Sequence, residues 1–481
     1  MEKIQNDDLS GSLKVILSNV LAILVSLLAG FVVPKVLSIQ NYAEYKTYIL
    51  YIEYVGIFHL GLVNGIYLKY GHLNYNELPY LKIRSYFNLL FIWHTVVQIL
   101  LFSIIKIYVT TSRGIHALPL YFVILNLIFI NLNYFFSMMN QCTKRFILDS
   151  RIVFFQTLIR CCSIGFLWLF KIDSYIYLLI IQTVIQVSVF IVYLVKDKEL
   201  IFGKREKLAH CRQELIIMEK NGFAVLLSEW IGIFIFNLDS IFVNMFFSSL
   251  NFAYYSFAMT IVLLVIRFIN IVSKLIFPFL IRVEESKRAV TYDDMSCVLS
   301  GVSALALSGF YIIKKIILCF LPHYDLSIRL VSVLMIIIFF KVLNGLVCGN
   351  FYKILGCMSR YTINNLLGLC IGIGSNIVAY MIWRSVYAIA LASVLTFLIW
   401  YINADIFLSG KLGIVKRILA RKYCFIAFAV ALYFICMFLK WYLGILIYLL
   451  GIVVIFVAIY YQKIQRWSEK INCKNVRNED I

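Results

Sequence analysis

The chain has 481 residues, of which 63% are hydrophobic and only 14% are charged, and its mean hydropathy is +0.91. These values lie far outside the range of soluble globular domains, so they exclude a soluble protein and predict an integral membrane protein. The formal charge of +20 does not indicate nucleic-acid binding, because the sequence has no compact basic domain or aromatic platform for it.

Apolar segments of about 20 residues, the length that crosses a bilayer core, recur along the whole chain. Backbone polar groups in lipid must bond internally, and the alternating pattern of a membrane β-barrel is absent, so each segment is predicted to be a helix. The predicted fold class is all-α integral membrane with about 14 transmembrane helices. These helices begin near Ser12, Tyr45, Ser85, Ala117, Ser150, Ser174, Gly222, Phe252, Met295, Leu326, Tyr361, Ser385, Lys422 and Trp441.

The distribution of basic residues between the loops predicts the orientation of the chain in the membrane. With the N-terminus in the cytoplasm, inside loops and tails carry roughly three times as many Lys and Arg as outside loops do. The densest inside loop runs from Lys196 to Lys220, whereas the link around Ser248 to Asn251 has no basic residue. Both termini are therefore predicted to be cytoplasmic, and attraction of the inside loops to anionic lipid is a secondary expectation.

The chain also repeats itself weakly, in the same order and at equivalent topological places. Two six-helix lobes explain this repeat, and because six is even the lobes are parallel, related by an axis along the membrane normal. The paired stretches are Asn41–Tyr45 with Asn251–Tyr255, Leu118–Tyr121 with Leu321–Tyr324, and Asn140 and Lys144 with Asn350 and Lys353.

The repeat and the charge pattern predict five regions. They are an N-terminal six-helix lobe at 1–195, a basic cytoplasmic linker at 196–220, a C-terminal six-helix lobe at 221–410, helices 13 and 14 at 411–462, and a cytoplasmic tail at 463–481. The twelve cysteines include no CxxC pair and mostly lie inside predicted helices, so neither a disulfide framework nor a metal site is predicted.

Several stretches resemble one family of transporters. They are Asn41–Tyr48 after the first helix, His59–Tyr67 at the end of the second, Asn237–Asp239 in the seventh, and Leu321–Tyr324 with Asn350–Gly356 around the tenth. Over nearly its whole length the chain resembles the polysaccharide-biosynthesis flippases of the multidrug/oligosaccharidyl-lipid/polysaccharide exporter superfamily. These are the Wzx-type translocases of O-antigen, lipopolysaccharide and capsule repeat units.

The resemblance implies alternating access around a central cavity between the two lobes. The implied substrate is an undecaprenyl-diphosphate-linked oligosaccharide, carried from the cytoplasmic to the outer leaflet of a bacterial inner membrane. The resemblance implies a transporter without catalytic residues or cofactors rather than an enzyme. Its implied partners are the lipid-linked oligosaccharide, membrane lipids, H⁺ or Na⁺ as a candidate coupling ion, and a polysaccharide polymerase as a candidate protein partner.

Cations at membrane depth are the first candidate site residues. Arg267, Asn270 and Lys274 have the spacing i, i+3 and i+7, which places them on one face of the eighth helix. In a flippase they form a ladder of donors for the diphosphate, whereas in the structural alternative Arg267 pairs with an acid of the seventh helix and Lys274 extends toward the inside surface. Arg160 and Lys341, on helices five and ten, are candidates for which we favour an ion pair or a polar contact between helices.

Acids at membrane depth are the second set. Glu53, Glu229 and Asp239 must each be paired, protonated or bound to a cation, because hydrocarbon does not hold an isolated carboxylate. Three interpretations remain open: the acids neutralise the basic ladder, accept hydrogen bonds from sugar hydroxyls, or carry a coupling proton or sodium ion.

Three glycines in the predicted second helix indicate close packing or a bend. Gly56, Gly61 and Gly65, the last two in small-xxx-small spacing, permit close helix packing or a bend where the lobes meet. We favour packing over a gating hinge.

Two classes of rival function stay open, another transporter and a membrane-embedded enzyme. A cation-coupled multidrug exporter of the same superfamily is expected to prefer acids over bases in its cavity, which Arg267 and Lys274 oppose. A membrane-embedded glycan polymerase or ligase usually has a long external loop, whereas the longest loop here is predicted to be internal. A glycosyltransferase commonly has a DxD motif, which this chain lacks.

Overall fold

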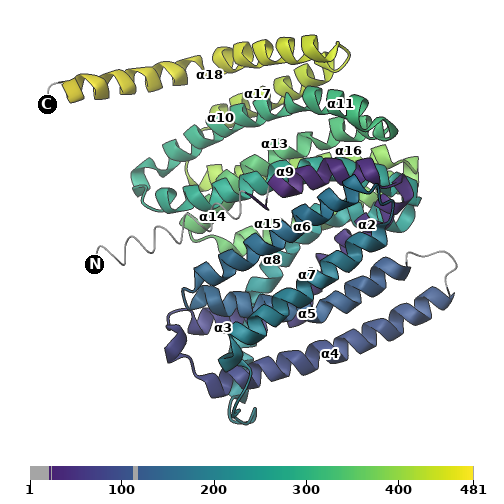
Figure 1. Ribbon diagram of the computed structural model, residues 1–481. Helices are drawn as coiled ribbons and strands as arrows, with labels where there is room; N and C mark the ends of the chain where they lie inside the picture. Colours follow the sequence, from purple (N-terminus) through teal and green to yellow (C-terminus); the bar gives the residue numbers. More distant parts are fainter. Residues whose placement is uncertain (1–20, 23, 112–116, 480–481) are drawn as a thin grey trace. The chain divides into compact units, whose positions relative to one another are not determined.

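The computed structural model describes residues 21–22, 24–111 and 117–479, and at 108–111, 228–229, 267–279, 467–468 and 470–479 it describes the backbone alone. Within these ranges the chain consists of helices joined by turns, without a strand (Figure 1). It divides into two compact units: unit 1 ends at Phe257 and unit 2 begins at Ala258, inside one long helix. The predicted all-helical class is confirmed.

Unit 1 contains an apolar helix at Leu24–Val36 and the following elements. They are α2 (Ile39–Ile52), η1 (Val55–His59), α3 (Leu62–Tyr70), η2 (Tyr75–Glu77), α4 (Tyr80–Thr111), α5 (Ala117–Cys142), α6 (Phe146–Leu169), α7 (Tyr175–Lys196), η3 (Lys198–Leu200), α8 (Arg212–Phe246) and the start of α9 (Ser249–Leu280).

Unit 2 contains the rest of α9 and the following elements. They are η4 (Glu285–Lys287), α10 (Arg288–Leu307), α11 (Gly309–Phe320), η5 (Pro322–Tyr324), α12 (Ser327–Leu334), α13 (Ile336–Val342), the π-helical η6 (Leu343–Cys348), α14 (Gly349–Ile354), α15 (Met358–Trp383), α16 (Val386–Lys411), α17 (Lys416–Cys436) and α18 (Trp441–Glu479).

Twelve helical segments among the described residues are long and apolar enough to cross a membrane. The bent pair Ile39–His59 and Leu62–Tyr70 adds a thirteenth. The shorter helix Leu24–Val36 lies in the first predicted segment, whose start at Ser12 is outside the described residues. The multi-span membrane fold predicted from hydropathy therefore holds along the described chain.

The second span is bent at two residues with positive φ. Leu60 and Gly61 have φ of 49° and 86°, and the axis turns by 59° between η1 and α3. The Gly61 N–H donates to Nδ1 of His59 at 3.1 Å, which satisfies one backbone group freed by the bend. Glycine suits this place because it adopts positive φ without steric cost.

The same glycine region lets α3 and α8 approach closely. A Cβ added to Gly222 would lie 2.0 Å from the carbonyl oxygen of Gly61, and one added to Gly65 would lie 2.1 Å from that of Met218. Backbone is therefore in contact with backbone, as small residues allow in membrane helix pairs. The close packing predicted for Gly61 and Gly65 is confirmed.

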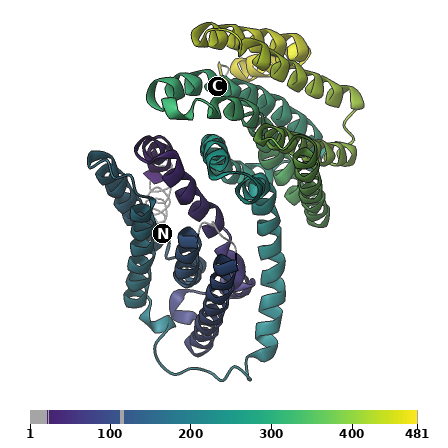
Figure 2. The same ribbon diagram turned by 90° about the vertical axis from the view of Figure 1, so that its right-hand side faces the viewer.

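The basic segment between α7 and α8 runs along one end of unit 1 as an extended connection (Figure 2). It is tied to the start of α4. The guanidinium of Arg84 donates to the carbonyls of Glu199 and Lys204 at 2.8 and 3.2 Å, and Ser85 Oγ donates to the carbonyl of Glu206 at 2.6 Å. These bonds satisfy backbone groups that a loop would otherwise leave to water.

Two of the repeated stretches have matching local geometry. Ser38 Oγ accepts from the N–H of Asn41 at 3.4 Å at the start of α2, and Ser248 Oγ accepts from the N–H of Asn251 at 3.4 Å at the start of α9. Such serine caps satisfy free donors at a helix N-terminus. Asn140 and Asn350 also match, because each amide nitrogen donates to the carbonyl four residues earlier, at 3.0 and 2.9 Å.

Candidate functional site

Two of the predicted acids, Glu53 and Asp239, lie on two contacting helices of unit 1. Glu53 caps the end of α2, and its Oε2 accepts a 2.8 Å hydrogen bond from Nδ2 of Asn237 on α8. Asp239 follows two residues later on α8 and is 3% exposed. The hydroxyl of Tyr54 lies within electrostatic range of both carboxylates. The structure thus brings Glu53 and Asp239 into one neighbourhood.

The Asp239 carboxylate is held by two donors. The hydroxyl of Tyr255, near the start of α9, donates to Oδ2, and the N–H of Ser240 donates to Oδ1 at 2.9 Å. Tyr255 is the last residue of the repeated Asn251–Tyr255 stretch. A buried carboxylate that receives two hydrogen bonds is stabilised as an acceptor at a fixed position.

Aromatic rings cluster around Tyr54, which follows Glu53 in the sequence. The ring of Tyr54 lies 4.9 Å from that of Phe234 and 5.6 Å from that of Trp230, measured between centroids. Trp230 is 5% exposed. A low-polarity wall of this kind strengthens the electrostatic interactions beside it.

The contact between α2 and α8 continues as a row of polar groups. Tyr51 donates to Oδ1 of Asn244 at 3.0 Å, and Nδ2 of Asn244 donates to Oγ1 of Thr47 at 3.0 Å. Asn237 and Asn244 are seven residues apart on α8, so they share a face. We call this row the α2–α8 polar strip; it consists of Thr47, Tyr51, Glu53, Asn237 and Asn244.

The strip presents mainly oxygen acceptors along the contact between α2 and α8. Carboxylate oxygens in such surroundings can accept hydrogen bonds from hydroxyl groups, or bind a proton or a small cation. The sequence predicted Glu53 and Asp239, but it missed Thr47, Tyr51 and Asn244. The i, i+4 spacing of Thr47 and Tyr51 and the i, i+7 spacing of the two asparagines are signals that could have identified them.

Glu229 and the basic ladder lie where only the backbone is described. Arg267, Asn270 and Lys274 are in α9, and Glu229 is in α8. Since α9 is one helix from Ser249 to Leu280, the three ladder positions share a face of it, as their spacing requires. The side chains of all four residues lie outside the described part of the chain.

Arg160 and Lys341 occupy different units. Arg160, on α6, is exposed and lies within electrostatic range of the Tyr48 hydroxyl on α2. Lys341, on α13, has its ammonium 5.2 Å from the ring centroid of Trp400 on α16. This is the geometry of a cation–π contact between helices.

Two ion pairs with buried carboxylates were not among the predicted site residues. In unit 1, Oδ1 of Asp197 lies 2.6 Å from a guanidinium nitrogen of Arg145, and its Oδ2 accepts from Nδ2 of Asn140 at 2.8 Å. In unit 2, Oδ1 of Asp405 lies 2.5 Å from the ammonium of Lys422. Both carboxylate side chains are fully buried.

The two acids occupy equivalent places in the repeat. Tyr193 precedes Asp197 by four residues, and Tyr401 precedes Asp405 by four, an offset of 208 that closely matches the 210 of the serine caps. The Asp405 pair is the more densely bonded, because Tyr292 and Tyr423 each donate a hydroxyl to it at 2.7 Å. A Tyr-x-x-x-Asp comparison between the lobes could have found both acids.

Comparison with solved structures finds proteins of similar fold. The chain is similar to the lipid II flippase MurJ in an inward closed conformation, with a TM-score of 0.66 and 12% identity over 95% of this chain and 100% of that one. A MOP superfamily transporter from Pyrococcus furiosus gives a TM-score of 0.45 at 11% identity, over 84% of this chain and 95% of that one. A eukaryotic MATE transporter gives 0.39 at 13% identity, over 83% and 95%.

No protein-family model matches the sequence, and no curated protein matches it. At 12% identity the likeness to MurJ shows a shared fold. The chain therefore shares its fold with that structure over 95% of its own length.

Proposed function

We propose that this chain is a flippase that moves an undecaprenyl-diphosphate-linked oligosaccharide from the inner to the outer leaflet of a bacterial inner membrane by alternating access. The observation that carries the proposal is the fold shared with a lipid II flippase over the whole of that chain. The resemblance of Asn41–Tyr48 and His59–Tyr67 to O-antigen and capsule translocases favours a polysaccharide repeat unit as the oligosaccharide.

The diphosphate is the part of this substrate that hydrocarbon rejects most strongly. In the proposal, the face of α9 that carries Arg267, Asn270 and Lys274 supplies donors for it, since guanidinium binds phosphate bidentately and ammonium acts as a point charge. Arg160 and Lys341 contribute further positive charge on other helices.

The oligosaccharide offers hydroxyl groups, which need acceptors. The α2–α8 polar strip supplies carboxylate and amide oxygens, and its acid, Glu53, is exposed. Glu229 and Asp239 either accept sugar hydroxyls, neutralise the basic ladder or carry a coupling ion. The polyprenyl tail stays in lipid, so the protein needs to shelter only the polar head.

The membrane potential supports the proposed direction. Outward movement of one negative charge across an inside-negative membrane gains about 2.3 kcal/mol per 100 mV. A diphosphate with about two charges therefore has a substantial driving force without a chemical reaction.

The test is a proteoliposome assay with a lipid-linked oligosaccharide whose head group is scored for accessibility on each leaflet. Arg267→Ala is expected to abolish translocation at unchanged protein level. Arg282→Ala, an exposed arginine just beyond the end of α9, is the matched control and should translocate at the wild-type rate.

Three results would contradict the proposal. Translocation at the wild-type rate in Arg267→Ala would refute the proposed role of the basic ladder in binding the diphosphate. Ion-driven uptake of cationic drugs without head-group translocation would indicate a multidrug exporter. Longer glycans accumulating on one leaflet would indicate a polymerase.

A further inference from the structure

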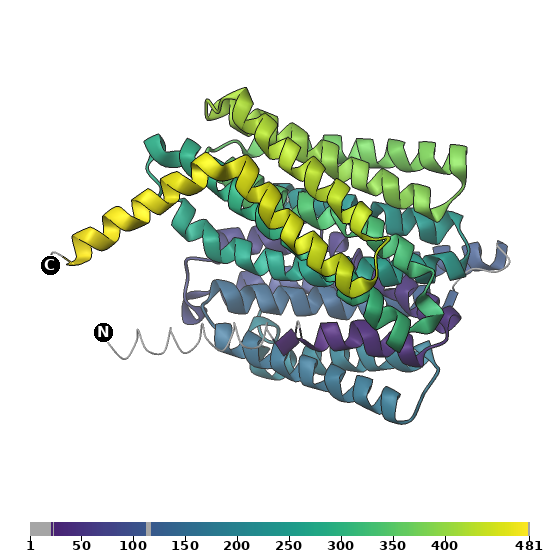
Figure 3. The ribbon, with the colours of Figure 1, turned by 90° about the horizontal axis from the view of Figure 1, so that it is seen from above.

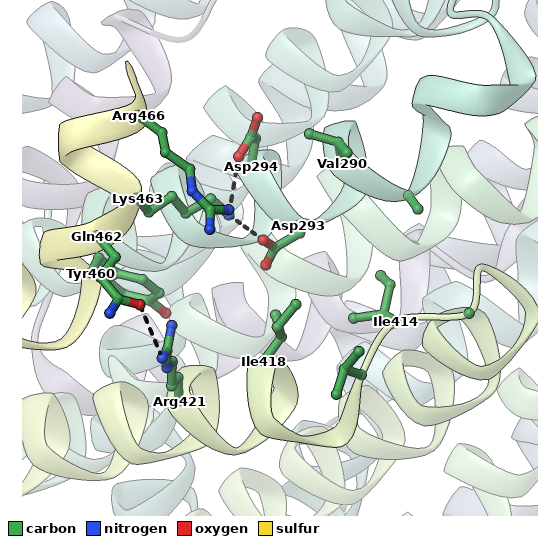
Figure 4. A pocket seen from close by; sticks show the side chains of 13 residues that line it. Val290, Asp293, Asp294, Ile414, Ile418, Arg421, Tyr460, Gln462, Lys463 and Arg466 are labelled. Atoms are coloured by element: carbon green, nitrogen blue, oxygen red, sulfur yellow. Dashed lines mark hydrogen bonds and ion pairs between the residues drawn. The ribbon is translucent and has the colours of Figure 1, made fainter. Parts of the chain in front are cut away.

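A pocket opens at one end of unit 2, and none of the candidate site residues named above lines it. It has a volume of about 430 Å³ and lies between the start of α10, the start of α17 and the second half of α18. Figure 4 shows basic side chains of α17 and α18 and acidic side chains of α10 directed toward one another around it. The volume lies within the range of about 300 to 1,000 Å³ that is typical of ligand pockets.

The charges of the pocket are unevenly matched. The ammonium of Lys463 lies 2.5 Å from a carboxylate oxygen of Asp293 and 3.1 Å from one of Asp294. Arg421 donates to the amide oxygen of Gln462 at 3.4 Å and makes no ion pair with a described carboxylate. Arg466 makes no ion pair with any described side chain. Two guanidinium groups therefore line the pocket without a carboxylate partner, and guanidinium is the group that binds phosphate best.

The opposite wall of the pocket is apolar and partly open. Val290 and Val415 are 54% and 64% exposed, and Ile414 and Ile418 lie between them along the lining. Cationic groups beside exposed aliphatic groups are typical of the boundary between lipid head groups and acyl chains.

The course of α18 places the pocket at that boundary. A bilayer core needs about 20 helical residues, and 20 residues from Trp441 end at Tyr460. The helix is kinked there, with φ of −108° and ψ of 15°, and Tyr460 lines the pocket. Beyond the kink, α18 extends past the other helices of unit 2 (Figure 3).

The sequence after the kink has the pattern of a helix that lies on an anionic membrane surface. Its basic positions repeat at i, i+3, i+7, i+11 and i+14, so they form one stripe, and apolar positions form a second stripe beside it. The basic positions are Lys463, Arg466, Lys470, Lys474 and Arg477, and the apolar ones are Ile464, Trp467 and Ile471. The first two basic positions are pocket residues.

We propose that this pocket binds the phosphate of an anionic membrane phospholipid, with Arg421 and Arg466 as its ligands. Its acyl chains extend along Val290 and Val415, and the stripe after Tyr460 rests on neighbouring head groups. Asp293 and Asp294 weaken the site, because they occupy Lys463 and repel the phosphate. The predicted orientation puts this end of the helices in the cytoplasm.

Binding is measured by native mass spectrometry of the purified full-length chain, titrated with phosphatidylglycerol, with zwitterionic phosphatidylcholine and with inorganic phosphate. The wild type should bind phosphatidylglycerol at least tenfold more tightly than phosphatidylcholine. A basic residue near an anionic head group contributes about fivefold, so Arg421→Ala with Arg466→Ala should weaken phosphatidylglycerol binding about 25-fold and leave phosphatidylcholine unchanged. Lys440→Ala, an exposed lysine at the other end of α18, is the control and should bind as the wild type does.

A second pair of substitutions should change the affinity for phosphatidylglycerol in the opposite direction. Asp293→Asn with Asp294→Asn removes two carboxylates that repel the phosphate, and should tighten phosphatidylglycerol binding about fivefold. A misfolded protein would not gain affinity, so this arm tests the site even where the arginine variants are unstable. Equal binding of the two lipids, unchanged binding in the double arginine variant, weaker binding in the asparagine pair, or displacement of the lipid by equimolar inorganic phosphate would each overturn the proposal.

Discussion

The contact between α3 and α8 makes a quantitative prediction for a single methyl group. In Gly222→Ala the new Cβ would lie 2.0 Å from the carbonyl oxygen of Gly61 and 2.5 Å from the backbone nitrogen of Gly65. Side-chain carbons do not approach backbone closer than 3.0 Å, so the two helices must separate locally by about 1 Å. Overpacking of this kind costs about 1 to 3 kcal/mol.

Gly232→Ala is the matched control on the same helix. No heavy atom lies within 4 Å of its added Cβ, so this variant only removes the conformational freedom of glycine and should stabilise α8 by about 0.5 to 1 kcal/mol. The same helical gain applies at Gly222. The difference between the two variants therefore isolates the clash, at about 1 to 3 kcal/mol.

The assay is thermal unfolding of the purified chain in detergent. For a unit of this size, a change of 1 kcal/mol in the free energy of unfolding shifts the melting midpoint by about 2 to 4 °C. Gly222→Ala should therefore melt about 2 to 12 °C below Gly232→Ala. Translocation should fall in Gly222→Ala as well, because α8 also carries Asn237 and Asp239. Equal midpoints for the two variants would show that α3 and α8 are not in backbone contact.

Two further predictions concern acids. Asp405→Leu should destabilise unit 2 by about 3 to 5 kcal/mol because it leaves Lys422 buried without its carboxylate partner. Adding Lys422→Met should restore most of the lost stability in the same thermal assay. A double variant that is as unstable as Asp405→Leu alone would contradict this prediction. Burial alone would raise the pKa of Asp173, between α6 and α7, but hydrogen bonds from Asn41 and from the N–H of Ser38 outweigh it and hold the pKa below the ordinary aspartate value. Asp173→Asn should therefore lower the melting midpoint at neutral pH. The difference in midpoint between the variant and the wild type should vanish as the pH falls below about 4 through that lowered pKa. A difference in midpoint that does not depend on pH would refute the role of the charge.

Hydropathy and charge predicted the spans well, because membrane crossing depends on local length and composition. The first predicted segment from Ser12 lies partly outside the described residues, and the other thirteen correspond to helices. The repeat at Asn41 and Asn251 was also visible in sequence, since a serine cap three residues before each asparagine is a local feature. The lobe boundaries at 195 and 221 stay predictions.

The interruptions of the helices were not predictable in the same way. The bend at Leu60 and Gly61 depends on the close approach of α8, and the π-helical turn Leu343–Cys348 lies in the most buried span of unit 2. Nothing in the local sequence of either helix specifies the neighbour that the backbone has to accommodate. The α2–α8 polar strip has the same origin, because Glu53 and Asn237 are 184 residues apart and meet only through tertiary packing.

The buried ion pairs show how the repeat diverged. Asp197 and Asp405 follow a tyrosine at the same spacing, and both are fully buried, so each needs a cation nearby. In unit 1 the cation is Arg145, which lies in the short turn between α5 and α6. In unit 2 it is Lys422, which belongs to α17.

In the second lobe the buried carboxylate is thus paired with a cation on α17, whereas in the first lobe it is paired with a cation in the turn between α5 and α6. Removing one partner of a buried pair costs several kcal/mol, so α17 is held to α16 by an ion pair that lipid cannot replace. Tyr423 strengthens this attachment, because it donates to Asp405 from the same helix. A chain shortened before Lys416 would therefore lose more than two helices: it would leave Asp405 as an uncompensated acid in the interior of the second lobe.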